Sequence, residues 1–470
     1  MPYLNVEEVE SALELAAATP NDAFTERLAL PHLTWEGRRC HLIRIGAGSG
    51  DRAGVYFVGG VHAREWGSAD ILVNFVELVT EAYRSGSGIT LPGKSFTAPE
   101  VKRIVETLDV FVFPQVNPDG RAFSMSFDGD EMWRKNRRPA PSEAPGCMGV
   151  DINRNYDWLW DFEAHFADDA PVSASKSPCH AQVYIGPSAA SEPETRNVVS
   201  VLDDAPAIQF FIDVHSYSQL VLHAWGDDDN QSNSPAMNFM NPAHASTRGH
   251  LDARGHPLAD RYREFIDPQD ERTMVELGSR LRDAIKDVHG STYKVQQAAD
   301  LYPTSGASDD YVYSRHIVDP SKSKVYAFVI EWGKYKPDDI AGSFHPAYPE
   351  MVGIIEEITA GLIEFCLAAV DALRPPPIDT DRWASVLHIL FGITEGGGGL
   401  ALTPGGKPVP VGPDGPLRLL DAHKRDVLVG LAITELGGLV ADPASRAEIE
   451  SQGLQVIERA VTTLRTGRRR

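Results

Sequence analysis

Two apolar stretches far apart in the sequence each end in side chains that can bind a metal ion. Residues 55–61 are followed by His62 and, three residues later, by Glu65; residues 208–214 are followed by His215. A lone His-x-x-Glu arises often by chance, but a second strand that ends in histidine supplies a third donor. Two imidazoles and one carboxylate leave a fourth zinc position open, as catalytic zinc sites require. We therefore expect the fold to bring the ends of these two strands together.

Short runs rich in Val, Ile and Phe alternate along the chain with stretches of helical periodicity. This alternation predicts an α/β fold built on a sheet. Runs that are apolar on both faces indicate central strands covered by helices on each side. The expected strands cover residues 40–45, 55–61, 110–116, 208–214, 220–225, 293–297 and 325–330, and the expected helices cover residues 69–83, 99–108, 192–202, 273–288 and 349–372.

Further polar motifs follow in a set order. They are Asn-Pro-Asp-Gly at 117–120, Trp-Arg-Lys-Asn-Arg at 133–137, Val-Asp-Ile-Asn-Arg-Asn at 150–155, Ser-Gly-Ala-Ser-Asp-Asp at 305–310, and Glu331 after an apolar run. With the two histidine motifs, this order resembles the zinc metallocarboxypeptidases of the carboxypeptidase A/B type, over residues 5–370. The resemblance implies a mixed, twisted sheet of about eight strands flanked by helices, within a domain of residues 1–374.

The resemblance also implies the metal site and the catalytic groups. The two histidines and Glu65 would hold one Zn²⁺ per chain, and Asp151 would accept the far N–H of His62 and fix its tautomer. Glu331 would be the general base that takes a proton from the attacking water. A carboxylate at the end of so apolar a strand is expensive to bury without a purpose. Arg134 would stabilise the oxyanion formed from the scissile carbonyl.

Carboxypeptidase chemistry needs groups that recognise the free C-terminal carboxylate of a peptide. Arg154 with Asn153 resembles that clamp, because a guanidinium matches a carboxylate through two parallel hydrogen bonds. Tyr302 resembles the mobile tyrosine that closes over bound substrate in the family. The other contacts implied by the resemblance are Arg64 and Arg137 along the entry path and Tyr217 beside a neighbouring subsite.

Asp309 falls where the family lines the pocket for the C-terminal side chain. An acidic residue at this position resembles enzymes that prefer C-terminal Lys or Arg, since a buried carboxylate can select a cation. Asp310 is next to it and can share the role. A broad side-chain preference is the alternative.

The expected function is that of a zinc-dependent exopeptidase that removes single residues from the C-terminus of peptides. One alternative is a metal-dependent N-acyl-amino-acid amidohydrolase, which needs the metal ligands and the glutamate but not the arginine, asparagine and tyrosine set. A second alternative is a scaffold protein that acts through its C-terminal extension.

Composition limits the partners and the location. The formal net charge is −22, and acidic and basic side chains are equal in number from Pro375 onward, so residues 1–374 carry the whole excess. An acidic body argues against binding to nucleic acid. No apolar run approaches the roughly 18 residues that a bilayer crossing needs. Because no signal peptide is visible, we expect a cytoplasmic protein, or a secreted one if an export segment has been removed.

The four cysteines are too few for a disulfide scaffold in a chain of this length. Cys40 and Cys366 lie in apolar periodic segments and are expected in the core. Cys147 and Cys179 lie in polar loops, at positions that resemble a loop-closing disulfide of secreted family members. Two free thiols in a reducing cytoplasm are the alternative.

Two segments differ from what the resemblance implies: residues 226–271 are longer than the corresponding stretch of the family, and the residues after 374 have no counterpart in it. Residues 226–271 are polar and are expected to form a surface loop or loop pair, either overhanging the cleft or without a role in it. Three prolines from Pro375 end the last helix of the peptidase domain. Residues 375–470 are expected to form a small, mainly helical extension, with helices at 383–391, 417–436 and 445–464, a linker or hairpin at 396–416, and a surface for homo-oligomer formation as one interpretation.

Overall fold

The computed structural model describes residues 3–18, 23–48, 52–249, 262–373, 399–402 and 408–411. The chain divides into two compact units, Met1–Val370 and Asp371–Arg470. In the second unit, β13 (Gly399–Leu402) and β14 (Pro408–Val411) form an antiparallel pair. This pair agrees with the hairpin expected within residues 396–416. The three helices expected in the extension lie outside the described residues.

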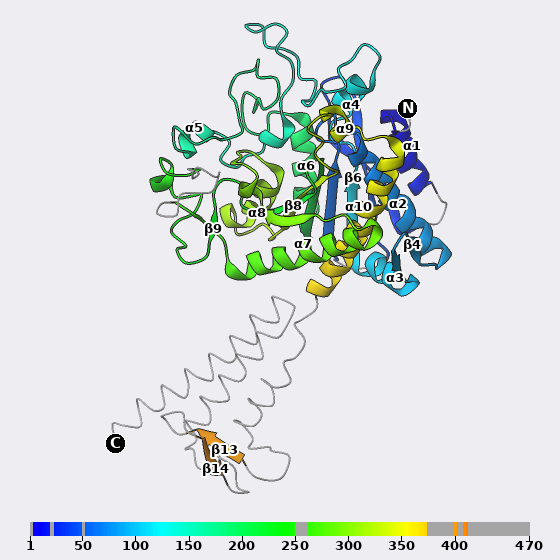
Figure 1. Ribbon diagram of the computed structural model, residues 1–470, viewed down its shortest axis with the longest axis vertical. Helices are drawn as coiled ribbons and strands as arrows, with labels where there is room; N and C mark the ends of the chain where they lie inside the picture. The colour runs from blue at the N-terminus through cyan, green and yellow to red at the C-terminus, as the bar shows by residue number, and fades with distance from the viewer. Residues whose placement is uncertain are drawn as a thin grey trace. The chain divides into compact units, whose positions relative to one another are not determined.

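One mixed sheet of eight strands forms the centre of the first unit (Figure 1), in the order β1-β2-β6-β3-β7-β12-β8-β11. Four successive strands, β6, β3, β7 and β12, run parallel, and β2 and β8 are antiparallel to their neighbours in this group. The predicted mixed, eight-stranded sheet is confirmed. The strands are β1 (Thr25–Leu33), β2 (Arg39–Ile45), β3 (Ala53–Gly59), β6 (Leu108–Phe113), β7 (Ile208–Ser216), β8 (Leu220–His223), β11 (Lys294–Gln297) and β12 (Tyr326–Trp332).

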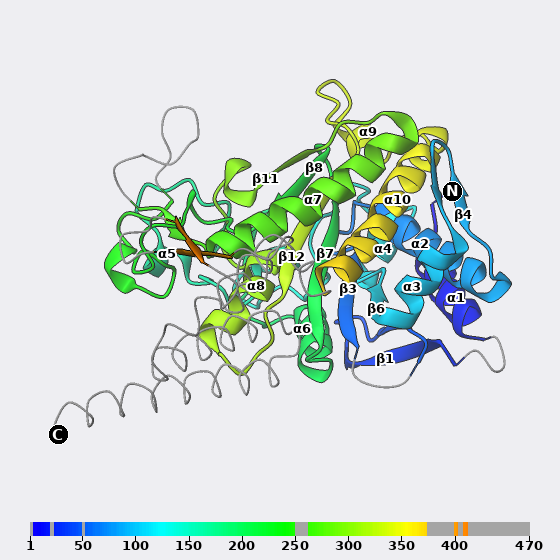
Figure 2. The ribbon, with the colours of Figure 1, turned by 90° about the horizontal axis from the view of Figure 1, so that it is seen from below.

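Three long helices, α2 (Gly67–Ser85), α7 (Pro268–His289) and α10 (Tyr348–Ala372), cover one face of the sheet (Figure 2). Phe365 of α10 contacts Phe57, Phe210 and Phe328, one from each of the three central strands, at ring-centroid distances of 6.2, 6.2 and 5.3 Å. Phe75 of α2 meets the same Phe57 edge to face at 5.3 Å. Alternate residues of a strand share a face, so these aromatic rings define the side of the sheet away from the proposed metal ligands.

Helices α6 (Pro193–Asp204) and α8 (Ser308–Val318) pack against the opposite face. On this face Tyr56 meets Phe211 edge to face, and Asp213 and His215 follow Phe211 at intervals of two residues. Both faces of β7 are therefore covered, and every residue of this strand but Gln209 is buried. This burial explains why its sequence is a nearly continuous apolar run.

The seven strands and five helices expected from periodicity are all present, with shifted ends. Strand β1 was not predicted, because it is an edge strand that contains Pro31 and is largely exposed. Helix α7 begins five residues before the expected start, since Asp267 caps it by accepting from Gln269 N and Asp270 N. The shorter elements are α1 (Val6–Ala17), α3 (Ala98–Thr107), α4 (Pro118–Met125), α5 (Phe162–His165), α9 (Ile340–Phe344), β4 (Ile89–Leu91), β5 (Lys94–Phe96), β9 (Asn230–Gln231), β10 (Glu264–Phe265), η1 (Ile152–Arg154), η2 (Pro242–His244) and η3 (Ala298–Asp300).

The expectation that residues 226–271 lie on the surface is wrong for part of the segment. Asp227, Arg248 and Glu264 are 0, 1 and 0% exposed. Arg248 Nε lies 3.1 Å from Asp227 Oδ2, and Tyr262 donates its hydroxyl hydrogen to Glu264. Buried charges are tolerated where they pair with one another. Polar composition therefore gave the wrong position here because these polar side chains contact one another inside the fold.

Cys147 and Cys179 are joined by a disulfide, so the bonded alternative is the one observed. Cys40 and Cys366 are buried free thiols, as predicted. Among the described residues, no helix combines the length and the apolar character that a bilayer crossing requires.

Candidate metal centre and substrate cleft

Three adjacent parallel strands deliver the central residues of the site to one edge of the sheet. The chain turns after β3 and presents His62 and Glu65, β7 carries His215, and β12 carries Glu331 in register with His215. Carboxyl ends of parallel strands meet at the same edge, which is where α/β proteins commonly bind ligands. The turn after β3 begins at Gly60, whose φ of +62° and close approach to Pro114 O disfavour any residue with a Cβ.

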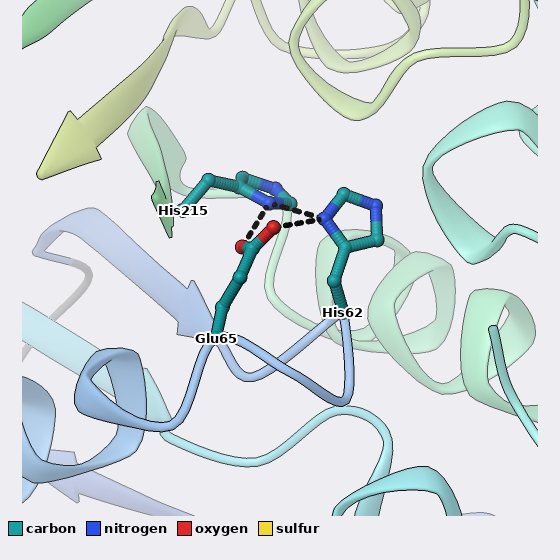
Figure 3. Close-up of side chains that lie close together, drawn as sticks. All are labelled: His62, Glu65 and His215. Atoms are coloured by element: carbon teal, nitrogen blue, oxygen red, sulfur yellow. Dashed lines mark hydrogen bonds and ion pairs between the residues drawn. The ribbon is translucent and has the colours of Figure 1, made fainter. Parts of the chain in front are cut away.

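His62, Glu65 and His215 converge as Figure 3 shows. Glu65 Oε1 lies 2.8 Å from His62 Nδ1, and Glu65 Oε2 lies 3.0 Å from His215 Nδ1. The two Nδ1 atoms are 3.0 Å apart, and the three side chains are at most 4% exposed. Among the described residues, this is the one group of three His, Cys, Asp or Glu side chains close enough to share an ion. The convergence expected from the strand ends is present.

The outward nitrogen of each imidazole faces a buried carboxylate. His62 Nε2 lies 3.1 Å from Asp151 Oδ1, and His215 Nε2 lies 3.0 Å from Asp213 Oδ2. A proton on each Nε2 leaves the lone pair of each Nδ1 directed inward, which is the tautomer that a metal ligand needs. The predicted partner Asp151 thus lies against His62. The sequence reading missed Asp213, although its spacing of two residues from His215 on a strand places both on one face.

The charges around the triad suit a divalent cation. Glu65, Asp151 and Asp213 carry three negative charges, and Arg134 supplies one positive charge through Nε and Nη2, at 3.0 and 2.9 Å from Asp151 Oδ2. A dication held by the triad would offset negative charge in this buried site. Two imidazoles and a carboxylate are also a donor set that zinc prefers. The residues present therefore fit a zinc ion.

The pKa values of the buried carboxylates show how these charges interact. Burial by itself would raise the pKa of Glu65, but His62 and His215 hold it well below its usual range. Burial likewise opposes ionisation of Asp151, but Arg134 and His62 keep its pKa far below the ordinary value. Both side chains are thus ionised at neutral pH, as a metal ligand and its supporting carboxylate must be.

Glu331 lies in a different environment. Burial raises the pKa of Glu331 to about 8; His215 opposes the shift and Glu65 adds to it. A carboxyl group with a pKa near neutrality is suited to accept and return a proton during catalysis. Trp332 beside it is fully buried and donates from Nε1 to Ser68 Oγ at 2.9 Å, so it packs within the core.

A cavity of ≈ 300 Å³ opens onto these side chains. Nine of the predicted site residues line it: His62, Arg64, Glu65, Arg134, Asn153, Arg154, Tyr217, Tyr302 and Glu331. Four further lining residues were not predicted: Ser216, Ser218, Leu301 and Phe344. The first three adjoin predicted residues in the sequence, whereas Phe344 comes from α9 and gave no sequence signal.

The groups proposed to bind a substrate carboxylate are held by the backbone around them. Arg154 Nε donates to Ser173 O at 2.6 Å, which fixes the direction of the guanidinium. Asn153 Oδ1 accepts from Ser308 N at 2.8 Å, so the NH₂ group of this amide remains available as a donor. The arrangement therefore presents a cation and an amide donor on the wall of the cavity.

Aromatic side chains form the other part of the cavity wall. Tyr217 stacks on Tyr335 at a centroid distance of 5.5 Å and meets Phe344 edge to face at 4.9 Å. The Arg64 guanidinium lies over Phe344 at 4.3 Å. Tyr302 is 40% exposed, as a side chain that closes over a substrate would be before closure.

Two residues predicted to contact the substrate do not line this cavity. Asp309 is 2% exposed at the start of α8, its Oδ2 atom has no hydrogen-bond partner among the described residues, and burial raises its pKa to about 6. The Arg137 guanidinium lies over Phe123 at 3.8 Å and over Trp133 at 5.0 Å. The substrate roles of both residues stay predictions.

Comparison with known proteins agrees with this geometry. The sequence profile of the zinc carboxypeptidase family matches residues 16–347, well over half of the chain. The chain belongs to the zinc carboxypeptidase family. The predicted family and the predicted class of zinc metallocarboxypeptidase are thereby confirmed.

The relatives of this zinc carboxypeptidase include both A and B types. It is 30% identical to carboxypeptidase B of Astacus astacus over 312 residues, which are 66% of this chain and 81% of that protein. It is 28% identical to carboxypeptidase A2 of Rattus norvegicus over 312 residues, 66% of this chain and 59% of that protein. The family match therefore leaves the side-chain preference undecided.

Solved structures agree on the fold. The structure of thrombin-activatable fibrinolysis inhibitor aligns with a TM-score of 0.57 at 21% identity, covering 78% of this zinc carboxypeptidase and 75% of that chain. Carboxypeptidase A of Helicoverpa armigera aligns with a TM-score of 0.54 at 20% identity, covering 78% and 74%. These likenesses confirm the predicted carboxypeptidase fold.

Proposed function

We propose that this protein is an exopeptidase that hydrolyses the C-terminal peptide bond of peptides with one zinc ion per chain. The observation that carries the proposal is the shared cavity: His62 and Glu65 of the metal triad, Glu331 and the Arg154–Asn153 pair all line it. A zinc ion bound by the triad would polarise the scissile carbonyl and make a nearby water more acidic.

Residues of the chain would carry out substrate binding, proton transfer and oxyanion stabilisation. Arg154 and Asn153 bind the free carboxylate of the substrate, which places the last peptide bond beside the triad. Glu331 accepts a proton from the attacking water and returns it to the leaving amine. Arg134 donates hydrogen bonds to the developing oxyanion. Tyr302 closes the cavity mouth and excludes bulk water.

This division favours peptides over N-acyl amino acids as substrates. An amidohydrolase of the alternative kind needs the metal ligands and the glutamate, but not a carboxylate clamp joined to an oxyanion arginine and a closing tyrosine. In this chain Arg134, Arg154 and Tyr302 all line the same cavity as the triad. Their presence supports the exopeptidase.

We further propose a preference for C-terminal Lys or Arg. The buried Asp309 carboxyl group has an oxygen without a hydrogen-bond partner among the described residues, which a substrate cation would supply. A relative of 30% identity is a carboxypeptidase B. Entry of a cationic side chain favours ionisation of Asp309, whose pKa burial raises to about 6.

Matched peptides test the proposal. Each peptide is made with a free C-terminus and as the C-terminal amide, ending in Lys, Arg, Leu or Glu, and products are followed by mass spectrometry with and without a chelator. We expect stepwise loss of single C-terminal residues from the free acids, no cleavage of the amides, fastest release of Lys and Arg, and no reaction with chelator. Cleavage of internal bonds, or equal cleavage of acid and amide, would contradict the exopeptidase assignment.

The Cys147–Cys179 disulfide supports a location in an oxidising compartment rather than the cytoplasm expected from the sequence. Counting the free thiols of protein purified under thiol-blocking conditions tests this location: two are expected, and four would contradict it. Self-association through residues 375–470 also stays a prediction. Measurement of the solution mass of the full chain, where a dimer or higher oligomer is expected and a monomer would contradict it, tests that prediction.

A further inference from the structure

Asp213 is a charged residue in the middle of the most buried strand of the sheet. It is 0% exposed in β7, and its partners in the neighbouring strands are Val58 of β3 and Val329 of β12. Its Oδ1 atom has no hydrogen-bond partner among the described residues. Removing a carboxylate from water is unfavourable unless strong partners compensate. An aliphatic residue would fill this position without that cost, so the contacts of the side chain must explain a carboxylate here.

Two contacts made by Asp213 Oδ2 explain the presence of this carboxylate. This oxygen lies 3.0 Å from His215 Nε2, and it accepts a hydrogen bond from Ser308 Oγ at 2.7 Å. The first contact is at hydrogen-bond distance, but Nε2 does not point straight at the oxygen. In the second contact, Ser308 at the start of α8 holds the carboxylate, on the face of the sheet opposite the Phe365 cluster.

We propose that Asp213 is a positioning residue for the metal ligand His215, held in place by Ser308. Asp213 keeps the proton of His215 on Nε2, directs the Nδ1 lone pair towards the ion, and offsets positive charge that the bound ion induces on the ring. Both histidine ligands are then supported by a buried carboxylate, His62 by Asp151 and His215 by Asp213. The inference rests on the zinc site of the proposed function.

Ser308 contacts both Asp213 and Asn153. Its hydroxyl group donates to Asp213, and its backbone N–H donates to Asn153 Oδ1 at 2.8 Å. Because the two bonds use different atoms, a substitution can remove one and keep the other. Ser308→Ala deletes the bond to Asp213 and leaves the backbone bond that orients Asn153. We therefore expect this variant to lose zinc affinity while the KM of the zinc-saturated enzyme is unchanged.

The experiment measures zinc dissociation constants by competition with a chromophoric chelator, and the visible spectrum of the cobalt-substituted protein. Asp213→Asn, which keeps the shape of the side chain and removes its charge, is expected to weaken zinc binding about 10–100-fold and to change the cobalt bands. Asp151→Asn is the positive control, with a loss of similar size. Asp109→Asn is the matched negative control: Asp109 lies in β6 of the same sheet and pairs with Arg44 and Arg52 away from the site.

Each outcome decides the inference. Zinc affinity and cobalt spectrum equal to wild type in Asp213→Asn would overturn it. If that variant does not fold, Ser308→Ala decides alone: weaker zinc binding at an unchanged KM supports the inference, and unchanged zinc binding overturns it. A wild-type protein that binds zinc and hydrolyses no peptide would refute the proposed function, while the affinity comparison still decides the role of Asp213. A wild-type protein that binds no zinc would overturn both.

Discussion

Replacement of Glu331 by glutamine tests the central step of the proposed chemistry. The side chain lines the cavity but belongs to neither the metal triad nor the carboxylate clamp. Glutamine has nearly the same shape and cannot take a proton from water. We therefore expect Glu331→Gln to bind zinc and substrate like the wild type and to fail in turnover.

The size of the effect follows from what is removed. General base catalysis contributes on the order of 10²–10⁴-fold, so the barrier should rise by about 3–5 kcal/mol. Thermal stability should not fall, because a neutral amide is less costly to bury than the carboxylate whose pKa burial raises to about 8. A bound dication lowers that pKa, so the wild-type kcat/KM should rise with pH to a midpoint below 8, and this acid limb should be absent from the variant.

The assay is steady-state hydrolysis of a blocked dipeptide across pH, with zinc content measured on the same samples. Glu194→Gln is the matched control, since Glu194 is a fully buried glutamate of α6 outside the cavity whose pKa burial also raises to about 8. Its kcat should equal the wild-type value. Wild-type turnover in Glu331→Gln would remove this residue from the mechanism. Loss of zinc from the variant would instead make it part of the metal site.

Three further predictions follow from the same structure. Arg154→Lys should raise KM for a free-acid peptide by about 10–100-fold with a smaller change in kcat, because the charge-assisted pair of hydrogen bonds to the substrate carboxylate is lost; unchanged kinetics would exclude the clamp. Asp309→Leu should lower kcat/KM for peptides ending in Lys and raise it for those ending in Leu, measured in competition, and an unchanged ratio would place the selective residue elsewhere. The wild-type free energy of unfolding should fall as pH rises from 4.5 to about 8, because Glu194 ionises near pH 4.5 in the unfolded chain but stays protonated in the folded protein up to about pH 8. Denaturant titrations of Glu194→Gln should show a shallower fall with pH, and an identical slope would refute the raised pKa of Glu194.

Much of the fold was accessible from the sequence because the sheet is covered on both faces. Central strands such as β7 and β12 are then continuous apolar runs, which stand out from the periodic helices between them. The edge strand β1 lacks this signal, since its exposed face and Pro31 resemble a loop. Local pattern therefore predicted the interior of the sheet better than its boundary.

The candidate site divides in a similar way. Sequence position alone predicted four site residues, His62, Glu65, His215 and Glu331. They stand at strand ends and carry chemistry that a strand interior would not require. Phe344 could not be predicted in this way, because it reaches the cavity from a short helix whose position depends on long-range packing. Asp213 was overlooked because a carboxylate within an apolar run is interpretable only when its contacts with His215 and Ser308 are known.

The sequence by itself determined which donors exist and that two distant strands end in them, since residue chemistry and periodicity are properties of neighbouring positions along the chain. Only the tertiary structure decided which groups face each other: Asp213 between His215 and Ser308, Asp309 buried outside the cavity lining, and Asp227 buried beside Arg248. Those placements depend on strand pairing and helix packing between segments tens to hundreds of residues apart. Short-range pattern carries no information about such contacts.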